Sequence, residues 1–519
     1  MNRKMVRIVS MLAAFTMLFL VGGCGNNENA VQTSGTKEAV FGTVAYFGAS
    51  NLNPADSYNG WYMSFFGAGE TLFKLDSNYK ANPWLVASFK TIDDYTWEFT
   101  LKDDVYFQNG EKMTAERVKA SLDYMMGFNV RGPETFTFDE ISADGQVLTI
   151  KTTVPTPALC NDLCDPLSVI QYIDDKIDYE TAAVMTGPFI VTEFTPQEKL
   201  VAKKFDKYWG GAAKIDKATF LTLSDQDAVT MALQSGEVDM AVMPDATAIA
   251  LFKDTSKYTV SSAVSTRGRA IMFNMDSDAA SDLAVREAIA MSIDRDGFVS
   301  GTNGTMVTCY GLYSDIVSYG GSDRLDLKVT KCDLEGAKKI LADAGYKDTD
   351  NDGVVEKKGK PLQFTMVTST DTYNVNLCQA LQSQLKKVGI DFVIGEYDST
   401  SDVVAAGKFD GLIVSNGMAP TGNFQYYLNT RFVSNASGNS GHYGNAEVDA
   451  LAAKLESTFD ADERDKIAVQ ITQILMDDMY YCVFANQKFY CIHSNSITGF
   501  EAQPSEYYLL DNQLDINKK

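Results

Sequence analysis

NVNLCQALQSQLKKVGIDFVI, residues 374–394, joins a helical stretch to an apolar strand through one glycine. We expect a helix over Asn374–Val388 that ends at Gly389, because glycine readily adopts the left-handed conformation that closes a helix. Ile390–Ile394 then has the apolar composition of a buried strand. Two further helical stretches also end at a glycine, Leu334–Ala344 and Ala228–Ser235. Helices that alternate with strands in this way predict an α/β fold.

The flanking segments extend this pattern toward both ends of the chain. Strands are expected at Ala39–Ala45, Trp97–Leu101, Val147–Thr152 and Phe189–Phe194. Helices are expected at Trp61–Glu70, Ala115–Met126, Val285–Ile293, Ala446–Leu455 and Ala461–Met479. Thr114 is the expected N-cap of the second of these helices.

The chain has 519 residues and a net charge of −23. This length predicts about two to four domains. The excess of carboxylates repels nucleic acid and anionic lipid headgroups, so we exclude both classes of ligand. The motifs of zinc peptidases, serine hydrolases and P-loop proteins do not occur in the sequence. We therefore expect no enzymatic activity and no cofactor.

The N-terminus has the features of a bacterial lipoprotein signal. Basic residues precede the apolar stretch Ile8–Val21, which is too short to cross a bilayer comfortably. Small residues then lead to Cys24. We expect a signal peptide over 1–23, lipid modification of Cys24, and a flexible polar tether over 24–38. A plain secretory signal with an incidental cysteine is the alternative.

Seven cysteines follow Cys24, and an odd number cannot pair completely. Cys160 and Cys164 have the spacing of one helix face, which is poor disulfide geometry. Cys482 and Cys491 would pair only across neighbouring strands. Each of these cysteines also fits a buried apolar position.

An acidic stretch, Asp348, Asp350, Asp352 and Gly353, is similar to the start of a calcium loop. A calcium loop needs a bidentate Glu at its twelfth position, which is Gly359 here. A polar turn over Asp348–Glu356 is the simpler interpretation, and weak calcium binding is the alternative.

Six blocks of sequence follow one another in the order of a known family. The first comprises Ala81–Val86, Thr96–Lys102 and Asn109–Glu116. The others are Thr186–Phe189 with Lys207–Gly211, Leu233–Asp239, Val285–Ala288 with Ile293–Arg295, Asp343–Tyr346, and Leu385–Asp391. Together they resemble family 5 of the extracellular solute-binding proteins, the peptide- and nickel-binding components of bacterial ATP-driven importers. The resemblance covers about Ala39–Asp511.

This resemblance implies a two-lobed periplasmic-binding-protein-like fold of class II, in the large cluster with an inserted subdomain. Lobe I is expected over 39–268 and 487–519, with the inserted subdomain at about 70–185. Lobe II is expected over 269–486. Two crossings of the chain would form the hinge, and the ligand would be enclosed between the lobes.

The resemblance also indicates ligand-binding candidates in lobe II. Peptide-binding members hold the peptide amino group with an acidic residue, and Asn423 stands at the matching position. A neutral Asn cannot form the charge-assisted bond that an ammonium prefers, which argues against a free-amine peptide. Asn416, Tyr426 and Tyr427 flank this position. Arg431 is the candidate clamp for a carboxylate, with a surface Arg as the alternative.

Nickel-binding members favour a metal ion held by a small organic chelator, with at most one His ligand. The chain has two His. His493 lies in a strand-like stretch and is expected to be structural. His442 lies in a Gly-rich loop and is the candidate metal contact, with a solvated loop residue as the alternative. One His cannot hold a bare transition metal, so His442 would act only through a chelated metal.

Five further candidates belong to lobe I. Tyr58, Trp61 and Tyr62 would line the cleft with aromatic rings, or pack in the core. Arg131 and Glu134 flank a Gly-Pro pair and would face the cleft or the solvent.

These observations predict a lipid-anchored substrate-binding protein of an ABC importer on the extracellular face of the membrane, the periplasmic side in a Gram-negative cell. It would capture an oligopeptide or a chelated nickel or other transition-metal ion and deliver it to the permease and ATPase. A monomer is expected. The alternative is a ligand-sensing or chaperone-like surface lipoprotein on the same fold.

Overall fold

The computed structural model describes residues 36–44, 49–370 and 372–518. The predicted signal peptide, Cys24 and most of the predicted tether lie outside these residues. Glu38, the last residue of the predicted tether, already belongs to strand β1 (Glu38–Thr43). The tether prediction is therefore one residue too long, because Glu38 pairs with Lys217 in a parallel ladder.

A mixed sheet organises the chain, with strand order β17-β16-β18-β12-β19-β11-β1-β10-β9-β8. Its strands, beside β1, are β8 (Phe189–Thr195), β9 (Lys199–Lys204), β10 (Lys217–Thr222), β11 (Met240–Val242), β12 (Tyr258–Phe273), β16 (Gln363–Ser369), β17 (Asp391–Tyr397), β18 (Gly411–Gly417) and β19 (Tyr481–Ser494). A short strand, β13 (Met306–Thr308), also pairs with β19. This arrangement confirms the α/β prediction.

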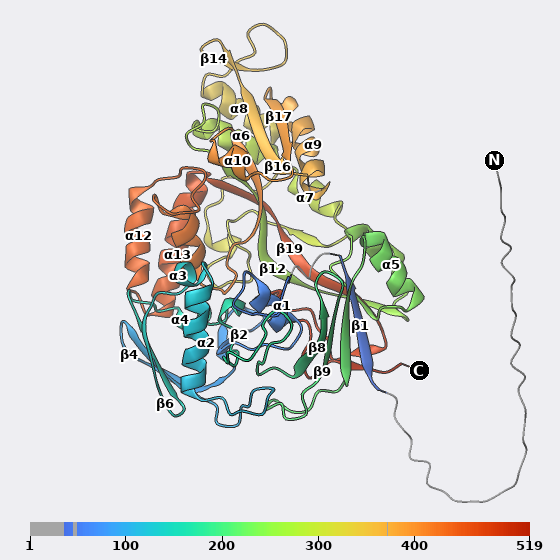
Figure 1. Cartoon of the computed structure of the whole chain (residues 1–519). Helices are drawn as coiled ribbons and strands as arrows, with labels where there is room; N and C mark the ends of the chain where they lie inside the picture. The colour runs from blue at the N-terminus through green and yellow to red at the C-terminus, as the bar shows by residue number, and fades with distance from the viewer. Residues whose placement is uncertain (1–35, 45–48, 371, 519) are drawn as a thin grey trace, which may run out of the picture. The chain divides into compact units, whose positions relative to one another are not determined.

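The two longest strands, β12 and β19, lie side by side and antiparallel (Figure 1). Their first register shift falls between Val264 and Gly268, where three residues of β12 lie opposite the single residue Gln487. On one side of this bulge β12 pairs with β19 alone, and on the other it pairs with β18 as well. The bulge lies beside the predicted lobe boundaries at 268/269 and 486/487, which stay a prediction.

Helices pack against both parts of this sheet. α9 (Thr372–Lys386) packs on β16 and β17, and α6 (Leu283–Ser292) packs between α8 (Leu334–Asp343) and α9. α5 (Gln226–Ser235) packs on β1 and β11 and ends at Gly236, whose φ of +78° confirms the predicted glycine cap. The helix–glycine–strand pattern thus predicted these elements correctly.

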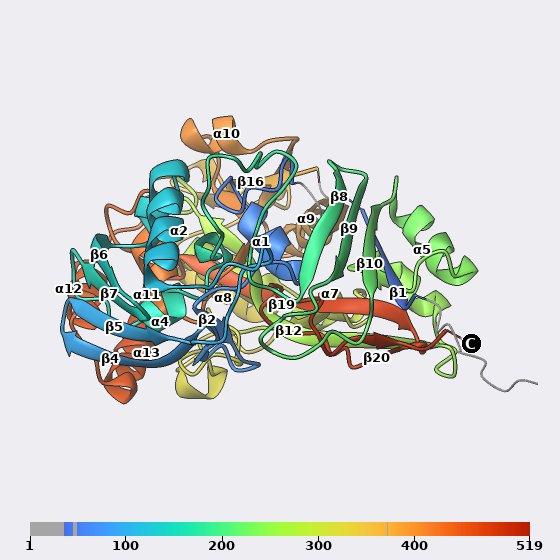
Figure 2. The same cartoon turned by 60° about the horizontal axis from the view of Figure 1, so that its bottom comes forward.

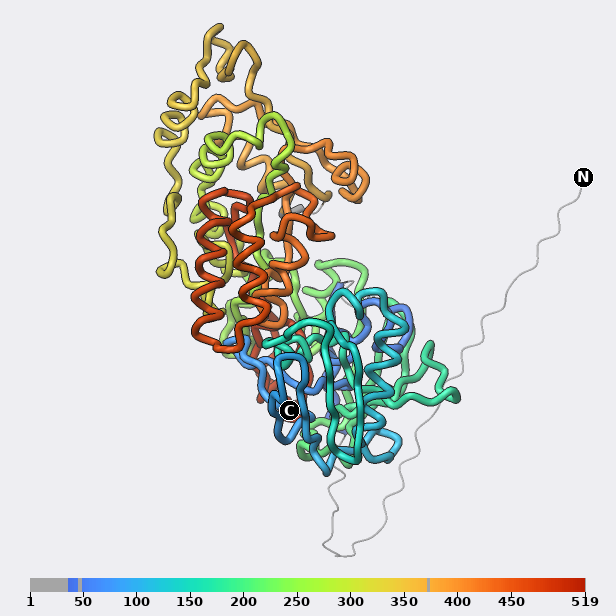
Figure 3. The backbone as a smooth tube through the Cα atoms, turned by 90° about the vertical axis from the view of Figure 1, so that its left-hand side faces the viewer, coloured from blue at the N-terminus to red at the C-terminus, as the bar shows by residue number. Residues whose placement is uncertain are grey.

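A second sheet of four antiparallel strands lies within the predicted subdomain, in the order β4-β5-β7-β6. Its strands are β4 (Val86–Asp93), β5 (Thr96–Leu101), β6 (Phe138–Asp144) and β7 (Val147–Thr152). α2 (Ala115–Phe128) packs on β6 and β7, as Figure 2 shows, and the Thr114 hydroxyl caps it by accepting from the Arg117 amide. Two antiparallel C-terminal helices, α12 (Ala446–Glu456) and α13 (Ala461–Asp477), pack side by side (Figure 3).

The remaining elements are short. They are α1 (Asn59–Phe65), β2 (Phe73–Leu75), β3 (Ala81–Pro83), α3 (Gly132–Thr135), α4 (Leu159–Asp162), η1 (Pro166–Ser168), η2 (Ala246–Leu251), α7 (Arg295–Ser300), η3 (Ser322–Arg324), β14 (Glu356–Lys357), β15 (Lys360–Pro361), α10 (Ser401–Ala405), α11 (Phe424–Tyr427), η4 (Leu428–Phe432), β20 (Ile497–Thr498) and β21 (Asp515–Ile516).

One apolar cluster joins parts of the chain that are far apart in sequence. Leu72, Phe99 and Leu163 belong to it, and so do Phe424 and Leu475. Burial of such side chains stabilises each by about 1.5–3 kcal/mol. The predicted subdomain therefore packs against the C-terminal third of the chain, including a stacked ring pair, Trp97 and Phe459.

One sequence prediction is wrong, and the disulfide alternative for Cys482 and Cys491 is excluded. The helix expected over Trp61–Glu70 is α1, which begins at Asn59 and ends at Phe65, because Gly67 turns the chain with a φ of +68°. Cys482 and Cys491 cannot pair across neighbouring strands, because both lie on β19. The seven described cysteines are all free thiols.

Candidate ligand-binding site

A cavity of about 520 Å³ lies where several distant segments meet. Seven of the ten predicted ligand-binding residues line it: Tyr58, Trp61, Arg131, Glu134, Asn416, Tyr426 and Arg431. The first four belong to predicted lobe I, and the last three belong to predicted lobe II. The volume and the mixture of aromatic and charged side chains are typical of a small-molecule site.

The floor of the cavity includes the β12 bulge. Ser265, Thr266 and Arg267 line the cavity, and the Ser265 hydroxyl donates to the Gln487 carbonyl at 2.8 Å. Because these residues leave the β12–β19 ladder, their side chains are available to the cavity.

Arg267 forms an ion pair with Glu506 in this floor. Its Nε and Nη2 donate to the two carboxylate oxygens at 3.2 and 2.9 Å. The Glu506 side chain is only 8% exposed, and the Trp61 indole donates to the Glu506 carbonyl at 2.7 Å. Glu506 has a φ of +59°, a conformation that is uncommon outside glycine and that recurs at functional sites.

Arg131 is the centre of a second charged group. Its guanidinium lies 4.3 Å from the Tyr58 ring centroid and 3.9 Å from the Asp165 carboxylate. Burial alone would lower the pKa of Arg131, but Asp165 and the Tyr426 and Tyr58 hydroxyls raise it above its ordinary value. Burial raises the pKa of Asp165, and Arg131 opposes this shift. Arg131 therefore stays a cation in the cavity.

Arg431 and Glu134 lack such partners. Arg431 Nη1 donates to the Gly438 carbonyl at 2.7 Å, and no described carboxylate lies at ion-pair distance from Arg431. Glu134 is exposed at the start of α3 and makes no ion pair with a described residue. Among the described residues, Arg431 and Glu134 are thus a cation and an anion of the cavity lining whose charges are not matched by neighbouring side chains.

Tyr62 and Asn423 do not reach the cavity. Tyr62 packs in an apolar cluster, where its ring stacks on Trp61 at 6.1 Å. Asn423 is buried as the N-cap of α11, and its Nδ2 donates to Asp162 at 2.7 Å. The N-cap geometry turns the Asn423 side chain away from the cavity, so neither residue belongs to the candidate site.

Both His also lie outside the cavity lining. His442 is exposed, has a φ of +58°, and its Nδ1 lies 2.8 Å from Asp276. His493 is buried in β19, where its ring nitrogen bonds the Ser494 carbonyl at 3.0 Å, and burial lowers its pKa. The structure does not bring His442 together with the other predicted site residues.

Sequence reasoning missed several lining residues. They are mainly Tyr79, Asp165, the bulge residues, Thr430, Glu506 and Tyr507. Arg267 lies next to the predicted lobe boundary at 268/269, which was a usable signal. Glu506 follows a Pro-Ser pair near the C-terminus and carries no local signal of its own.

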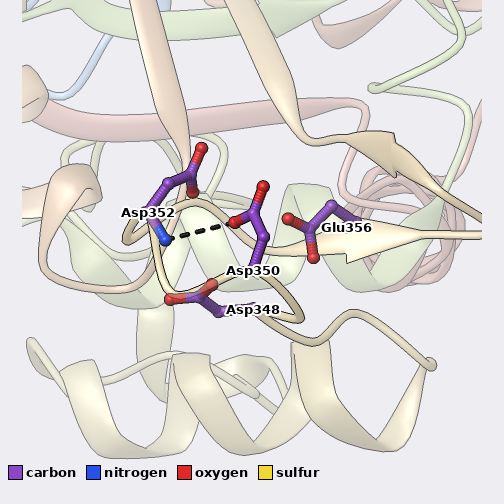
Figure 4. A group of neighbouring side chains, drawn as sticks. All are labelled: Asp348, Asp350, Asp352 and Glu356. Atoms are coloured by element: carbon purple, nitrogen blue, oxygen red, sulfur yellow. Dashed lines mark hydrogen bonds between the residues drawn. The ribbon is translucent and has the colours of Figure 1, made fainter.

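The acidic stretch lies apart from this cavity. Figure 4 shows the side chains of Asp348, Asp350 and Asp352 in one turn, near Glu356 at the start of β14. The three Asp are exposed, Glu356 is half-buried, and the carboxylate oxygens of the four residues lie within 4.8 Å of one another. Backbone amides already donate to these carboxylates, as Gly353 does to Asp348 at 3.1 Å. These contacts are typical of a polar turn, and weak calcium binding stays a prediction.

Comparison with known proteins identifies the family. The family model of the bacterial extracellular solute-binding proteins, family 5 (middle region), matches residues 80–439. The chain belongs to this family. Family 5 members are binding proteins and not enzymes, which confirms the prediction that the chain is not an enzyme.

Three relatives are similar over most of the chain. The nickel-binding protein NikA of Staphylococcus aureus is 28% identical over 87% of this chain and 90% of its own length. Its crystal structure in complex with Ni(L-His)₂ matches 93% of this chain and all of that chain, with a TM-score of 0.76. A nickel ABC transporter structure from Bacillus halodurans is 28% identical, covers 92% of this chain and all of that chain, and has a TM-score of 0.80. The oligopeptide-binding protein AppA of Bacillus subtilis is 22% identical over 83% of each chain.

These likenesses confirm the two-lobed periplasmic-binding-protein fold. The family description also confirms the prediction of an extracellular solute-binding protein. Within the described part of the chain, every helix is too short or too polar to cross a membrane.

Proposed function

We propose that this protein captures a metal ion, nickel or a related transition metal, that is already bound to a small carboxylate-bearing chelator. The observation that carries this proposal is Arg431, a cation of the cavity without a carboxylate partner among the described residues. A guanidinium in such a place binds a carboxylate strongly and bidentately. The likeness to S. aureus NikA, crystallised with Ni(L-His)₂, supports the same class of ligand.

The cavity lining argues that the metal brings its own ligands. None of the described residues that line the cavity is His or Cys. Transition metals such as nickel prefer imidazole and thiolate donors. Two of the three lining carboxylates, Glu506 and Asp165, are already paired with Arg267 and Arg131. The protein would therefore recognise the organic shell of the chelate.

An oligopeptide is the second candidate ligand. Glu134 is an unpaired carboxylate of the lining and provides the acceptor for an ammonium that Asn423 does not. The likeness to AppA supports this alternative. The cavity of about 520 Å³ suits a short peptide better than a long one.

The cellular role follows from the family. We infer that Cys24 is lipidated, that the protein is anchored to the outer face of the cell membrane as a monomer, and that it delivers its ligand to an ABC permease and ATPase. The two lobes, over 39–268 with 487–519 and over 269–486, would close on the ligand. The permease would recognise this closed conformation. A ligand-sensing or chaperone-like role would use the same cavity.

Isothermal titration calorimetry on the purified protein tests the ligand class. The titrants are Ni²⁺ with two equivalents of L-histidine, Ni²⁺ alone, L-histidine alone and trialanine. We expect one tight site for the Ni²⁺–histidine mixture only. Arg431→Met should weaken that binding by about 30- to 100-fold, because a charge-assisted bond is lost. Arg324→Met, a matched change outside the cavity lining, should have no effect.

Two results would contradict the proposal. Equal binding of Ni²⁺ alone would mean that the protein supplies the metal ligands. Tighter binding of trialanine than of the Ni²⁺–histidine mixture would assign the cavity to peptides.

A further inference from the structure

The two predicted lobes also touch outside the cavity lining, at the segment Thr421–Asn423. Asn161, in α4 of the predicted subdomain, donates to the Thr421 carbonyl at 2.7 Å and to the Tyr79 carbonyl at 3.3 Å. Next to it, Asn423 Nδ2 donates to the Asp162 carboxylate at 2.7 Å. These bonds need no ligand to form, because all their atoms belong to the protein.

Gly422 makes this close approach possible. Its φ is +73°, and a Cβ at this position would lie 2.2 Å from the Tyr79 carbonyl oxygen. That distance is far inside van der Waals contact, and the obstructing atom is backbone. Any larger residue at 422 would hold the two segments apart.

Asp162 acts on the cavity through Asn423. Asn423 Oδ1 accepts from the Gln425 amide at 3.0 Å, so the side-chain NH₂ is directed to Asp162. Asn423 is also the N-cap of α11, and α11 brings Tyr426 and Tyr427 to the cavity. The contact therefore fixes one wall of the ligand site against the opposite lobe, and Asp162 is a positioning residue.

We propose that Asp162, Asn423 and Gly422 form a clasp that closes the two lobes in the absence of ligand, and that closure is favoured when Asp162 is protonated, because closure buries this carboxyl group. The clasp goes beyond the proposed ligand class, since it depends only on the two-lobed fold.

The surroundings of Asp162 determine the direction of the pH effect. Burial raises the pKa of Asp162 to about 7, while the Asn423 amide and the Arg464 guanidinium lower it and Asp165 raises it. The titratable and charged groups that face Asp162 are Arg464 on α13, Asp165 after α4, and the thiols Cys160 and Cys164. Burial therefore outweighs the single cation.

When the lobes part, Asp162 is exposed and its pKa returns toward the ordinary value of about 4. Closure then takes up a proton between about pH 4 and pH 7. The closed form is favoured in acid. The equilibrium constant for closure falls by up to about tenfold per pH unit as the pH rises to 7, and it is lowest above that pH.

Hydrogen–deuterium exchange of the ligand-free full-length protein tests the clasp. The readout is the protection factor of amides in 421–427, corrected for intrinsic exchange, at pH 5.5 and pH 8.0. We expect protection to fall more than tenfold between the two pH values. Asp162→Asn keeps an acceptor for Asn423 but cannot titrate, so its protection should not change with pH. An unchanged pH response in Asp162→Asn would overturn the proposal.

Gly422→Ala provides a second test. It should lose protection of 421–427 at both pH values, because the Cβ obstructs the Tyr79 carbonyl. Gly407→Ala is the matched control, since Gly407 has a φ of +63° but nothing within 4 Å of its Cβ position. Equal exchange protection of 421–427 in the Gly422 and Gly407 variants would mean that the close approach of Gly422 to the Tyr79 carbonyl does not hold the lobes together. No ligand is added, so either result leaves the proposed ligand class untouched.

Discussion

Glu70 and Asp162 are two buried carboxylates with the same raised pKa and different surroundings. Glu70 is fully buried, and it accepts from the Tyr208 hydroxyl at 2.6 Å and from the Trp209 indole at 3.0 Å. Asp162 accepts from Asn423, which belongs to the opposite predicted lobe. Burial raises the pKa of each to about 7.

The location of the residues that bond each carboxylate determines which property of the protein its protonation changes. Tyr208 and Trp209, the two side chains that donate to Glu70, belong to predicted lobe I, so the ionisation of Glu70 changes the stability of that lobe. Asp162 lies between the lobes, so its ionisation changes closure as well. Two carboxylates with the same raised pKa thus affect different properties, because the partners of Glu70 lie in the same predicted lobe and the partner of Asp162 lies in the other.

The largest expected effect is that of Glu70→Gln on the pH dependence of unfolding. The raised pKa means that the folded state binds a proton more tightly than the unfolded state, so stability falls as the pH rises from about 4.5 to 7. This difference corresponds to about 3 kcal/mol at 1.36 kcal/mol per pKa unit. Urea unfolding at pH 5 and pH 8 should show that Glu70→Gln removes about this much of the decline.

The same variant sharpens the comparison with Asp162. Exchange protection of 421–427 in Glu70→Gln should keep the wild-type pH response. A loss of that response would mean that the two carboxylates are coupled and that the distinction between them is wrong.

The second effect concerns two Asn residues that cap helices and bond an Asp. Asn423 caps α11 and bonds Asp162 across the lobes, whereas Asn445 caps α12 and bonds Asp478 at 2.9 Å within predicted lobe II. Each change to Ala removes a cap and one hydrogen bond, at a cost of about 2 kcal/mol. Urea unfolding should give similar losses for both variants.

Of these two variants, only Asn423→Ala should affect the closure of the lobes. At pH 5.5, Asn423→Ala should lose the exchange protection of 421–427, and Asn445→Ala should retain it. Equal loss in both would assign the effect to general destabilisation and contradict the role of Asn423 between the lobes.

The smallest effect is expected for a solvated carboxylate. Asp123 pairs with Lys119 at 2.6 Å on α2, and both side chains are well exposed. Asp123→Asn should change the free energy of unfolding by less than about 0.5 kcal/mol, because water screens such pairs. If Asp123→Asn changed the free energy of unfolding as much as Glu70→Gln does, burial would not explain the large effect expected for Glu70.

Much of the fold was predictable because its signals are local. Gly236 ends α5 through its own positive φ, Gly389 has a positive φ in the turn after α9, and the Thr114 cap acts within one turn. Such features depend on neighbours in the sequence. The helix at Trp61 was placed less well, because α1 is held by its packing and by the turn at Gly67.

The site was predictable only in part, since its partners are far apart in the chain. Arg267 and Glu506 are separated by 239 residues, and no local pattern joins them. Asn423 was placed at the right segment, but its helix cap and Asp162 turn it away from the cavity. His442 was singled out by its Gly-rich loop and by the resemblance to nickel-binding members, and the structure places it beside Asp276.

X-ray diffraction at the nickel absorption edge, on crystals grown with Ni²⁺ and L-histidine, tests the central claim most directly. The account predicts one anomalous peak inside the cavity, with chelator carboxylate density at the Arg431 guanidinium. A peak at His442 and Asp276 or at the Asp348–Glu356 turn, with none in the cavity, would contradict it.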